Sequence, residues 1–502
     1  MSYDYDVIVI GSGAGGGTLA PVLARAGKKV LLVERGPKFT DRTAFQDEWR
    51  MLLRMEPYEG REVEVNGTAE RLFTGGIVGG GSSLYGAVLM RPAPEDFEPG
   101  HAYGDRIPRE IREWPVGYDE LKPYYDEAER IYHVAGNDPA EMPNVGVPEE
   151  GYPYSPPTLE PISRKLVRGM RREGLTPFHL PLGIDFRRCL RCPTCPGYFC
   201  PNDSRASSWN RLIAPAMETH DLELLTDTEA EEIVHDANGS LQSVRLLNRR
   251  TGERVVRTAG TYVVSAGAVG SAALLLRSRI KDPSGQLGRN YMYHAGALAA
   301  GLFQHPTGGA DRFIKQLGFT DLYHGTPEFP HKLGYAQVLP VPGRRSLQAN
   351  APLPVPTPIA ERLYEHIVTL AGAVEDLPLP NNRVTVSNEG RIQLQHRFHA
   401  YDVYRSQYFL KRLQRVLRRA GATATFGATG DKDQVHTAHQ VGTARFGRDE
   451  KTSVLDPDCR VHSYDNLYVV DGSFMPTSLG VGPALTIIAN ALRTADKIKG
   501  RG

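Results

Sequence analysis

The chain has 502 residues, and its 59 basic and 58 acidic side chains leave a formal net charge of +1. This balance argues against nucleic acid or an anionic membrane surface as the main partner. The longest apolar region, residues 262–276, is interrupted by serine and glycine and is too short to span a bilayer. The length predicts at least two domains. Because a buried strand is predicted almost at the N-terminus, we expect no signal peptide and a cytoplasmic protein.

The most informative segment lies near the N-terminus, where an apolar run meets glycines spaced as Gly11-x-Gly13-x-x-Gly16. A helix-prone stretch follows, and a second apolar run at 30–33 ends on Glu34. This order predicts a strand, a tight turn, a helix and a parallel strand that together bind a dinucleotide. Gly11 makes the turn, Gly13 lets a pyrophosphate approach the backbone, and Gly16 lets the helix pack on the strand. The helix N-terminus attracts phosphate, and Glu34 is placed to bind a ribose.

Patterns further along the chain predict the remaining elements. Six glycines between residues 75 and 86 indicate backbone held close to a flat or charged group. Alternating apolar and polar residues over 296–400 predict an antiparallel sheet, and Asn238-Gly239 predicts a hairpin turn. Apolar runs and helical spacing predict strands at 222–226, 231–234, 262–265 and 467–470, and helices at 118–132, 269–277, 404–420 and 483–498.

Four segments, in this order, resemble the glucose–methanol–choline (GMC) family of flavin oxidoreductases from end to end. They are the N-terminal glycine unit, GGIVGGGSSLYGAVLMR (75–91), WPVGYDELKPYYDEAE (114–129), and a C-terminal part with HQVGTARFG (439–447) and NLYVVDGSFMPTSLGVGPALTIIANALRTAD (466–496). The resemblance implies an α/β fold in which a Rossmann-like FAD-binding domain is interleaved with an antiparallel-sheet α+β substrate domain. It assigns 1–160, 201–295 and 434–502 to the FAD-binding domain, and 161–200 and 296–433 to the substrate domain.

Members of this family oxidise an alcohol to a carbonyl: a base takes the hydroxyl proton and a hydride passes to flavin N5. A histidine suits the task of a base near neutral pH. By its place in the His-x-x-Gly-Thr loop the base is His439, and His436, three residues earlier, is a secondary candidate that could stack beside it or face elsewhere. The cofactor-binding residues that the resemblance implies are Gly11, Gly13, Gly16, Glu34, Arg35, Gly79, Gly80, Ser82, Ser83, Ala230, Ala266, Asp471, Gly472, Pro483 and Leu485.

Two parts of the pattern bear on how FAD is held. The helix starting at Pro483 is one that, in the family, directs its N-terminus toward the flavin pyrimidine, where reduction builds negative charge. Some relatives attach the flavin covalently through a histidine in the glycine loop. The corresponding run Ser83-Leu84-Tyr85 has no histidine, so we expect non-covalent FAD.

The chain departs from the family pattern at Gly482, where relatives carry an asparagine or histidine that serves the substrate hydroxyl. Three explanations stay open. Another side chain, such as His436 or a polar residue of the substrate-domain sheet, supplies the second group. Alternatively, His439 suffices at a reduced rate. The third is a change of chemistry, such as a non-redox lyase on the same flavin fold.

The leading hypothesis for the substrate is the alcohol group of a sugar, glycoside or other polyol. The resemblance is nearest to bacterial sugar-oxidising members, and residues 300–400 carry polar and aromatic side chains without a long apolar tract. Tyr323 and Phe329 are candidates for stacking on a pyranose ring. The sequence leaves the electron acceptor open, and an oligomer is possible.

Four of the five cysteines lie within twelve residues, as Cys189-x2-Cys192-x2-Cys195-x4-Cys200. Such density is typical of zinc or iron–sulfur ligands. A zinc site, however, draws its thiolates from two knuckles separated by a loop, whereas these are crowded into one segment. Free thiols or disulfides are the simpler interpretation, and we assign no metal. The same run motivates one alternative function, a flavin-binding electron-transfer subunit.

Overall fold

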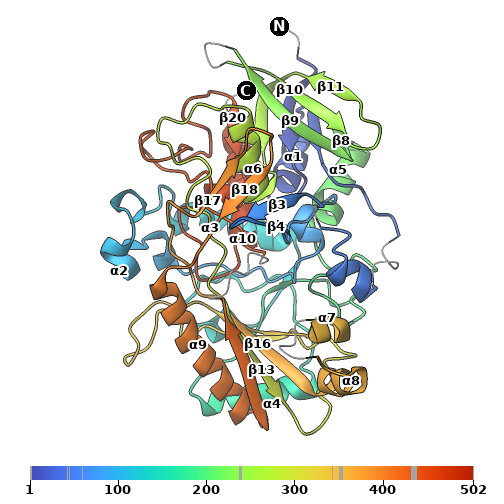
Figure 1. The fold of residues 1–502 in the computed structure, drawn as a ribbon, viewed down its shortest axis with the longest axis vertical. Coiled ribbons are helices and arrows are strands. Elements are labelled where there is room, and N and C mark those ends of the chain that lie inside the picture. Colours follow the sequence, from blue (N-terminus) through green and yellow to red (C-terminus); the bar gives the residue numbers. More distant parts are fainter. Residues whose placement is uncertain are drawn as a thin grey trace.

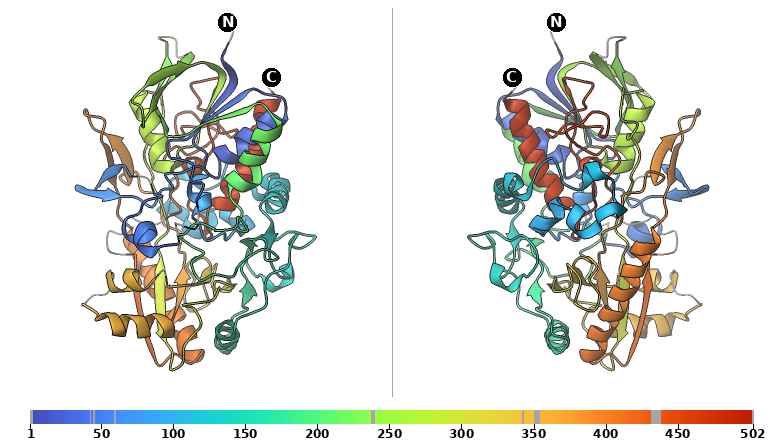
Figure 2. Two further views of the ribbon diagram at one scale, coloured as in Figure 1. Left: turned by 90° about the vertical axis from the view of Figure 1, so that its right-hand side faces the viewer. Right: turned by 90° about the vertical axis from the view of Figure 1, so that its left-hand side faces the viewer.

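A computed structural model describes residues 3–41, 43, 46–58, 60–236, 240–341, 343–349, 354–430 and 438–500. One half of the molecule is organised around a five-stranded parallel sheet, which lies in the part where both termini are found (Figures 1 and 2). In spatial order the strands are β20 (Leu467–Val469), β12 (Ala259–Val264), β1 (Tyr5–Ile10), β2 (Val30–Val33) and β8 (Leu222–Leu225).

Both faces of this sheet are covered, so the side chains of β2 are all buried. Successive side chains of β1 point to opposite faces. Val7 and Val9 pack in a core with helices α1 (Gly16–Arg25) and α10 (Ala484–Lys499). Ile8 and Ile10 belong to the core on the other face, with α6 (Gly267–Arg277) and the sheet of β9 (Thr228–His235), β10 (Leu241–Asn248) and β11 (Arg254–Arg257).

A six-stranded antiparallel sheet builds the opposite end of the molecule (Figure 1). Helix α9 (Ala400–Arg419) packs on this sheet, and α4 (Pro161–Arg172) packs on α9. Their apolar side chains form a separate core, with Phe409 and Leu413 fully buried. In spatial order the strands are β19 (Ala424–Thr429), β13 (Ala297–Leu302), β16 (Ile367–Gly372), β15 (Ala336–Leu339), β14 (Leu317–Phe319) and β6 (Phe178–His179).

A four-stranded sheet connects the two halves along one flank, because β18 pairs in parallel with β3, from far earlier in the chain. Its strands are β17 (Arg383–Val386), β18 (Ile392–Gln395), β3 (Glu62–Val65) and β4 (Thr68–Arg71). The other elements are β5 (Val134–Ala135), β7 (Leu182–Gly183), α2 (Gly100–Tyr103), α3 (Tyr118–Ile131), α5 (Ala214–Thr219), α7 (Arg344–Ala349) and α8 (Thr357–His366).

The α/β fold class predicted from the sequence is confirmed: a parallel Rossmann-like sheet is combined with an antiparallel sheet. The helix predicted at 483–498 begins one residue later, since Pro483 is its N-cap residue. The strand predicted at 231–234 is longer, and the turn predicted at Asn238-Gly239 lies outside the described residues. The domain bounds stay a prediction. Within the described part of the chain, no helix combines the length and apolar character needed to cross a membrane.

Candidate active site

A cavity of about 340 Å³ lies at the carboxyl ends of β1, β2 and β12, where open parallel sheets bind their ligands. The structure brings together around it most of the residues predicted from the sequence. These are Gly11, Gly13, Glu34, Arg35, Gly80, Ser82, Ala230, Ala266, His439, Asp471, Gly472 and Pro483.

The glycine turn after β1 has the shape that a dinucleotide requires. Gly11 has a φ of +104°, and a Cβ there would lie 2.1 Å from the carbonyl oxygen of Ser265. A Cβ on Gly13, by contrast, would meet no protein atom within 4 Å, although Gly13 lines the cavity. Space that the protein itself does not fill is therefore kept next to the N-terminus of α1, where free N–H groups attract phosphate. The residues present fit FAD.

Glu34 supports this turn from the tip of β2. Its Oε2 accepts hydrogen bonds from the Ser12 hydroxyl at 2.6 Å and the Ser12 amide at 3.1 Å. Its Oε1 accepts from the Gly36 amide at 2.8 Å. Glu34 thus fixes the glycine turn, and it also lines the cavity.

Four of the predicted cofactor residues do not line the cavity: Gly16, Gly79, Ser83 and Leu485. Gly16 acts in packing, because a Cβ there would lie 2.1 Å from the carbonyl oxygen of Gly11. Ser83 donates to the Val78 carbonyl, Gly79 has a φ of +86°, and Leu485 is buried in the core. These four residues therefore shape the loops and the helix that face the cavity.

Asp471 lines the cavity, but its carboxylate is committed to the protein. Oδ1 accepts from the Ser473 amide at 2.8 Å and the Ser473 hydroxyl at 2.5 Å. Oδ2 accepts from the Gly267 amide at 3.0 Å and the Ser271 hydroxyl at 2.5 Å. The side chain thus ties the turn after β20 to the start of α6 and places the backbone of Gly472 at the cavity.

An arginine cluster also lines the cavity, and the sequence analysis named only Arg35 of it. Glu229 accepts from Arg35 at 2.9 Å and lies 3.3 Å from Arg61 and 3.8 Å from Arg277. Burial acts in the opposite direction, but these arginines outweigh it and lower the pKa of Glu229. The arginines come from three distant segments, so no local motif marks them.

The candidate base, His439, is paired with a second histidine that the sequence analysis also missed. Nδ1 of His439 lies 3.0 Å from Nδ1 of His294. Nε2 of His294 lies 3.0 Å from the carbonyl oxygen of Ser478 and 2.9 Å from that of Leu479. Carbonyl oxygens only accept, so Nε2 of His294 carries the proton and its Nδ1 accepts. His439 therefore donates from Nδ1, which leaves the lone pair on its Nε2.

The backbone and the electrostatics of this pair are both unusual. His439 has a φ of +90° and His294 a φ of +80°, a region that non-glycine residues seldom adopt and that is enriched at functional sites. Burial lowers the pKa of His439 to about 3, and the nearby charge of Lys315 acts in the same direction. The imidazole is therefore neutral at physiological pH, with Nε2 ready to accept a proton.

Gly482 lies directly opposite this nitrogen. A Cβ on Gly482 would be 3.4 Å from Nε2 of His439 and 3.5 Å from its Cε1, and among the described residues, its chain neighbours apart, no other atom lies within 4 Å. Gly482 also lines the cavity. A side chain at this position would thus extend into the space beside the base, as the family pattern implies for asparagine or histidine.

We expect Gly482→Asn to lower alcohol turnover about tenfold or more, equivalent to ~1.4 kcal/mol or more of barrier. An asparagine amide would donate to Nε2 of His439 and occupy the space that a substrate needs. Gly482→Ala is the matched control, because its Cβ makes only ordinary van der Waals contact. Steady-state kinetics with both variants, at equal FAD content, make the comparison. An asparagine variant as active as the alanine variant would show that this position does not matter.

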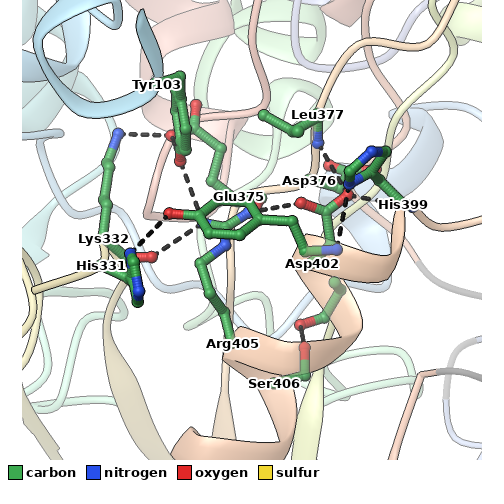
Figure 3. Close-up of polar contacts among 12 residues, drawn as sticks. Tyr103, His331, Lys332, Glu375, Asp376, Leu377, His399, Asp402, Arg405 and Ser406 are labelled. Carbon is green, nitrogen blue, oxygen red and sulfur yellow. Dashed lines mark hydrogen bonds and ion pairs between the residues drawn. The ribbon is translucent and has the colours of Figure 1, made fainter. Parts of the chain in front are cut away.

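Figure 3 shows part of a buried network of charges that includes Lys332, Glu375 and Arg405. This network is connected to the histidine pair through the backbone of Leu479. Lys332 forms ion pairs of 2.5 Å with both Asp96 and Glu375. Although burial opposes it, these two carboxylates raise the pKa of Lys332. Glu375 in turn accepts from the Leu479 amide at 2.9 Å, and the Leu479 carbonyl accepts from His294. Arg405 donates to the carbonyl oxygens of Lys332 and Glu375.

Lys332→Met is expected to lower the free energy of unfolding by about 3–5 kcal/mol, because it leaves two buried carboxylates without their cation. The loss should shrink as pH falls, since unpaired buried carboxylates have raised pKa values and fold more stably when protonated. Arg254→Met is the control: its ion pair with Glu231 is exposed, so the expected loss is within about 1 kcal/mol. Denaturant unfolding at two pH values measures both. Equal losses would contradict this account of the network.

The sequence analysis also named His436, Tyr323 and Phe329 as candidate site residues. His436 lies outside the described residues. Tyr323 and Phe329, proposed to stack on a sugar, do not line the cavity. Tyr323 is buried and hydrogen-bonded to Asp96, while Phe329 stacks on Tyr408 with ring centroids 3.8 Å apart. Their aromatic character serves the protein core, so that prediction was wrong.

The four clustered cysteines lie around one small void beside Phe313 and Arg205. Burial raises the pKa of Cys189 to about 11. Burial also raises the pKa of Cys200, but the Ser204 hydroxyl and the Arg205 amide outweigh it, and the net shift is downward. Among the residues that the structure describes, no three histidine, cysteine or acidic side chains are grouped as metal ligands. The role of this loop stays open.

Comparison with known proteins agrees with this geometry. Two models of the GMC oxidoreductase family match residues 5–296 and 378–491. The chain is 32% identical to 6'''-hydroxyparomomycin C oxidase of Streptomyces lividus, covering 98% of this chain and 91% of that protein. It is 31% identical to paromamine 6'-oxidase of Streptomyces fradiae, covering 99% and 91%. Identity to 2-methyl-1,2-propanediol dehydrogenase of Mycolicibacterium austroafricanum is 27%, covering 99% and 95%.

Solved structures share the fold at lower identity. Pyridoxine 4-oxidase from Mesorbium loti superposes with a TM-score of 0.72 at 20% identity, covering 98% of both chains. A formate oxidase superposes with a TM-score of 0.65 at 16% identity, covering 99% of this chain and 98% of the other. Membership of this family implies FAD as the cofactor. The glycine turn and the cavity next to it fit FAD. The chain belongs to the GMC oxidoreductase family and is an enzyme that acts on CH–OH groups.

Proposed function

We propose that the protein oxidises an alcohol group of a sugar-like substrate, with His439 as the base. The observation that carries this proposal is the lone pair on Nε2 of His439, fixed by His294 and directed at the space beside Gly482. When bound, FAD supplies the acceptor of the hydride that the carbinol carbon loses. Residues of the chain bind the substrate and remove its hydroxyl proton.

His439 accepts the hydroxyl proton at Nε2 while its Nδ1–H stays bonded to His294. The hydroxyl becomes strongly acidic as its carbon loses hydride, so a base with a pKa of about 3 is sufficient. His294 cannot rotate freely, because its Nε2–H is held by two backbone carbonyls. The pair therefore starts the reaction from one tautomer, and the fixed orientation of His439 lowers the entropic cost of the proton transfer.

Polar side chains near His439 support a hydroxyl-rich substrate. Tyr335, Gln337 and Lys315 line the cavity with it. Gln337 donates to the Tyr335 hydroxyl at 2.6 Å, but its Oε1 is buried and accepts a hydrogen bond from none of the residues that the structure describes. A buried acceptor of this kind is costly unless a ligand donates to it. Together with the two aminoglycoside-oxidising relatives, this favours a sugar or aminoglycoside alcohol.

We further propose that FAD is bound non-covalently. Among the described residues that line the cavity, His439 is the only histidine and there is no cysteine. The hydroxyl of Tyr85 is already engaged with the Ala206 carbonyl at 3.0 Å. Acid precipitation of the holoenzyme should leave the yellow chromophore in the supernatant; flavin that stays with the pellet would contradict non-covalent binding.

Anaerobic mixing of the holoenzyme with paromamine, glucose and 2-methyl-1,2-propanediol tests the proposed substrate class. We expect paromamine or glucose to bleach the absorbance of the oxidised flavin, because the flavin accepts the hydride, and to yield an equal amount of carbonyl product. Bleaching by the simple diol alone would reject a sugar-like substrate. Product formed without bleaching would instead support the lyase.

A further inference from the structure

Lys315 is a buried cation at the substrate end of the cavity that the mechanism above does not use. It lies in the turn before β14, is 3% exposed, and lines the cavity together with His439 and Gly482. Its Nζ donates to the Gly86 carbonyl at 2.7 Å. Among the described residues no carboxylate lies within ion-pair distance of it. An ammonium has three protons, so its single protein acceptor leaves donor capacity toward the cavity.

The surrounding chain is built around this ammonium. A Cβ on Gly86 would lie 1.9 Å from Nζ, so a side chain at position 86 would displace the ammonium from its present place. The next residue, Gln316, is anchored through its side-chain amide to Ser163, Thr158 and the Glu160 amide. These three hydrogen bonds hold the turn that carries Lys315 in place.

The charge of Lys315 acts at the base, because it contributes to the lowered pKa of His439. Burial, opposed by Cys195 and reinforced by Arg205, lowers the pKa of Lys315 itself to about 8. Among the described residues, the titratable and charged groups that interact electrostatically with Lys315 are Cys195, Arg205 and His439. The ammonium form is thus present at neutral pH and is lost as pH rises through this value.

We propose that the Lys315 ammonium donates the hydrogen bond to the substrate oxygen that the glycine at position 482 is unable to supply. This rests on the proposed alcohol oxidation. His439 takes the hydroxyl proton in the same step in which the C–H bond breaks and the hydride leaves to FAD. The oxygen becomes the carbonyl oxygen, and the ammonium stabilises the partial negative charge that it carries as its proton leaves. A fixed, desolvated cation stabilises such a developing charge far better than water does.

Lys315→Gln and Lys315→Arg test this proposal. The glutamine keeps a donor for the Gly86 carbonyl but loses the charge, whereas the arginine keeps the charge. We expect Lys315→Gln to slow anaerobic flavin reduction about 10²- to 10³-fold, as loss of an oxyanion donor does, with FAD content and melting temperature unchanged. The arginine variant should recover part of the rate. The fall in wild-type rate above about pH 8 should be absent from Lys315→Gln.

A binding measurement separates this proposal from the proposed function. Acetate offers an anionic oxygen, and its binding to the oxidised holoenzyme is followed by the change in FAD absorbance. We expect acetate to bind the wild type and Lys315→Arg more tightly than Lys315→Gln. Equal acetate affinity and equal flavin reduction in all three would show that Lys315 only caps the Gly86 carbonyl. If no alcohol bleaches the wild-type flavin, the proposed function is wrong. The comparison of acetate affinities still tests whether Lys315 binds an anionic oxygen.

Discussion

Replacing His439 by alanine should slow flavin reduction by alcohol about a hundredfold or more, the usual effect of losing a general base. His439 presents its Nε2 lone pair to the cavity, while His294 holds the opposite nitrogen. The substitution removes the proton acceptor but no contact with the core sheets. Anaerobic stopped-flow mixing at saturating substrate measures the reduction rate.

FAD content and thermal unfolding of His439→Ala provide the control, and both should match the wild type. Reduction at the wild-type rate would place the base elsewhere, and His436 would become the first candidate. The pH profile gives a second check. Since the pKa of His439 is about 3, the wild-type rate should stay level on the acid side until pH approaches that value.

Gly13→Val should abolish FAD binding while leaving the protein folded. A Cβ on Gly13 meets no protein atom within 4 Å, so the valine side chain would occupy only the space kept for the pyrophosphate. The flavin-to-protein ratio after acid release should fall to near zero. Cooperative thermal unfolding at the temperature of wild-type apoprotein would confirm that the fold is intact.

Gly16→Val is the matched comparison, because a Cβ on Gly16 would lie 2.1 Å from the Gly11 carbonyl oxygen and 2.9 Å from Val9. This variant should be unstable even without FAD, since overpacking beside a central strand displaces the backbone. A Gly13→Val protein that binds FAD stoichiometrically, or that unfolds as readily as Gly16→Val, would contradict the assignment of the pyrophosphate site.

Where the sequence predicted the structure well, the signal was local. The strand at 30–33, the glycine turn and Glu34 all lie within one short unit whose spacing has a direct geometric meaning. His439 was found through its motif rather than its chemistry, as one of fifteen histidines. Its role stays a prediction, but the structure does place it in the cavity.

The rest of the site depends on long-range packing. His294 and Lys315 lie in connecting segments far from position 439 in the chain, and no residue pattern joins them. Their positions follow from how the antiparallel sheet docks against the FAD-binding sheet. The positive φ of His439 and His294 likewise gives no signal in sequence, because that conformation is imposed by surrounding contacts.

The central claim, alcohol oxidation at His439, is tested most directly by flavin reduction with a substrate deuterated at the carbinol carbon. The same anaerobic stopped-flow measurement is made with protiated and deuterated alcohol, for wild type and His439→Ala. We predict that deuteration slows wild-type bleaching severalfold, because the C–H bond breaks in that step, and that His439→Ala is slower with either substrate. Conversion of the alcohol without bleaching, or bleaching unaffected by both the deuterium and the loss of His439, would contradict the account.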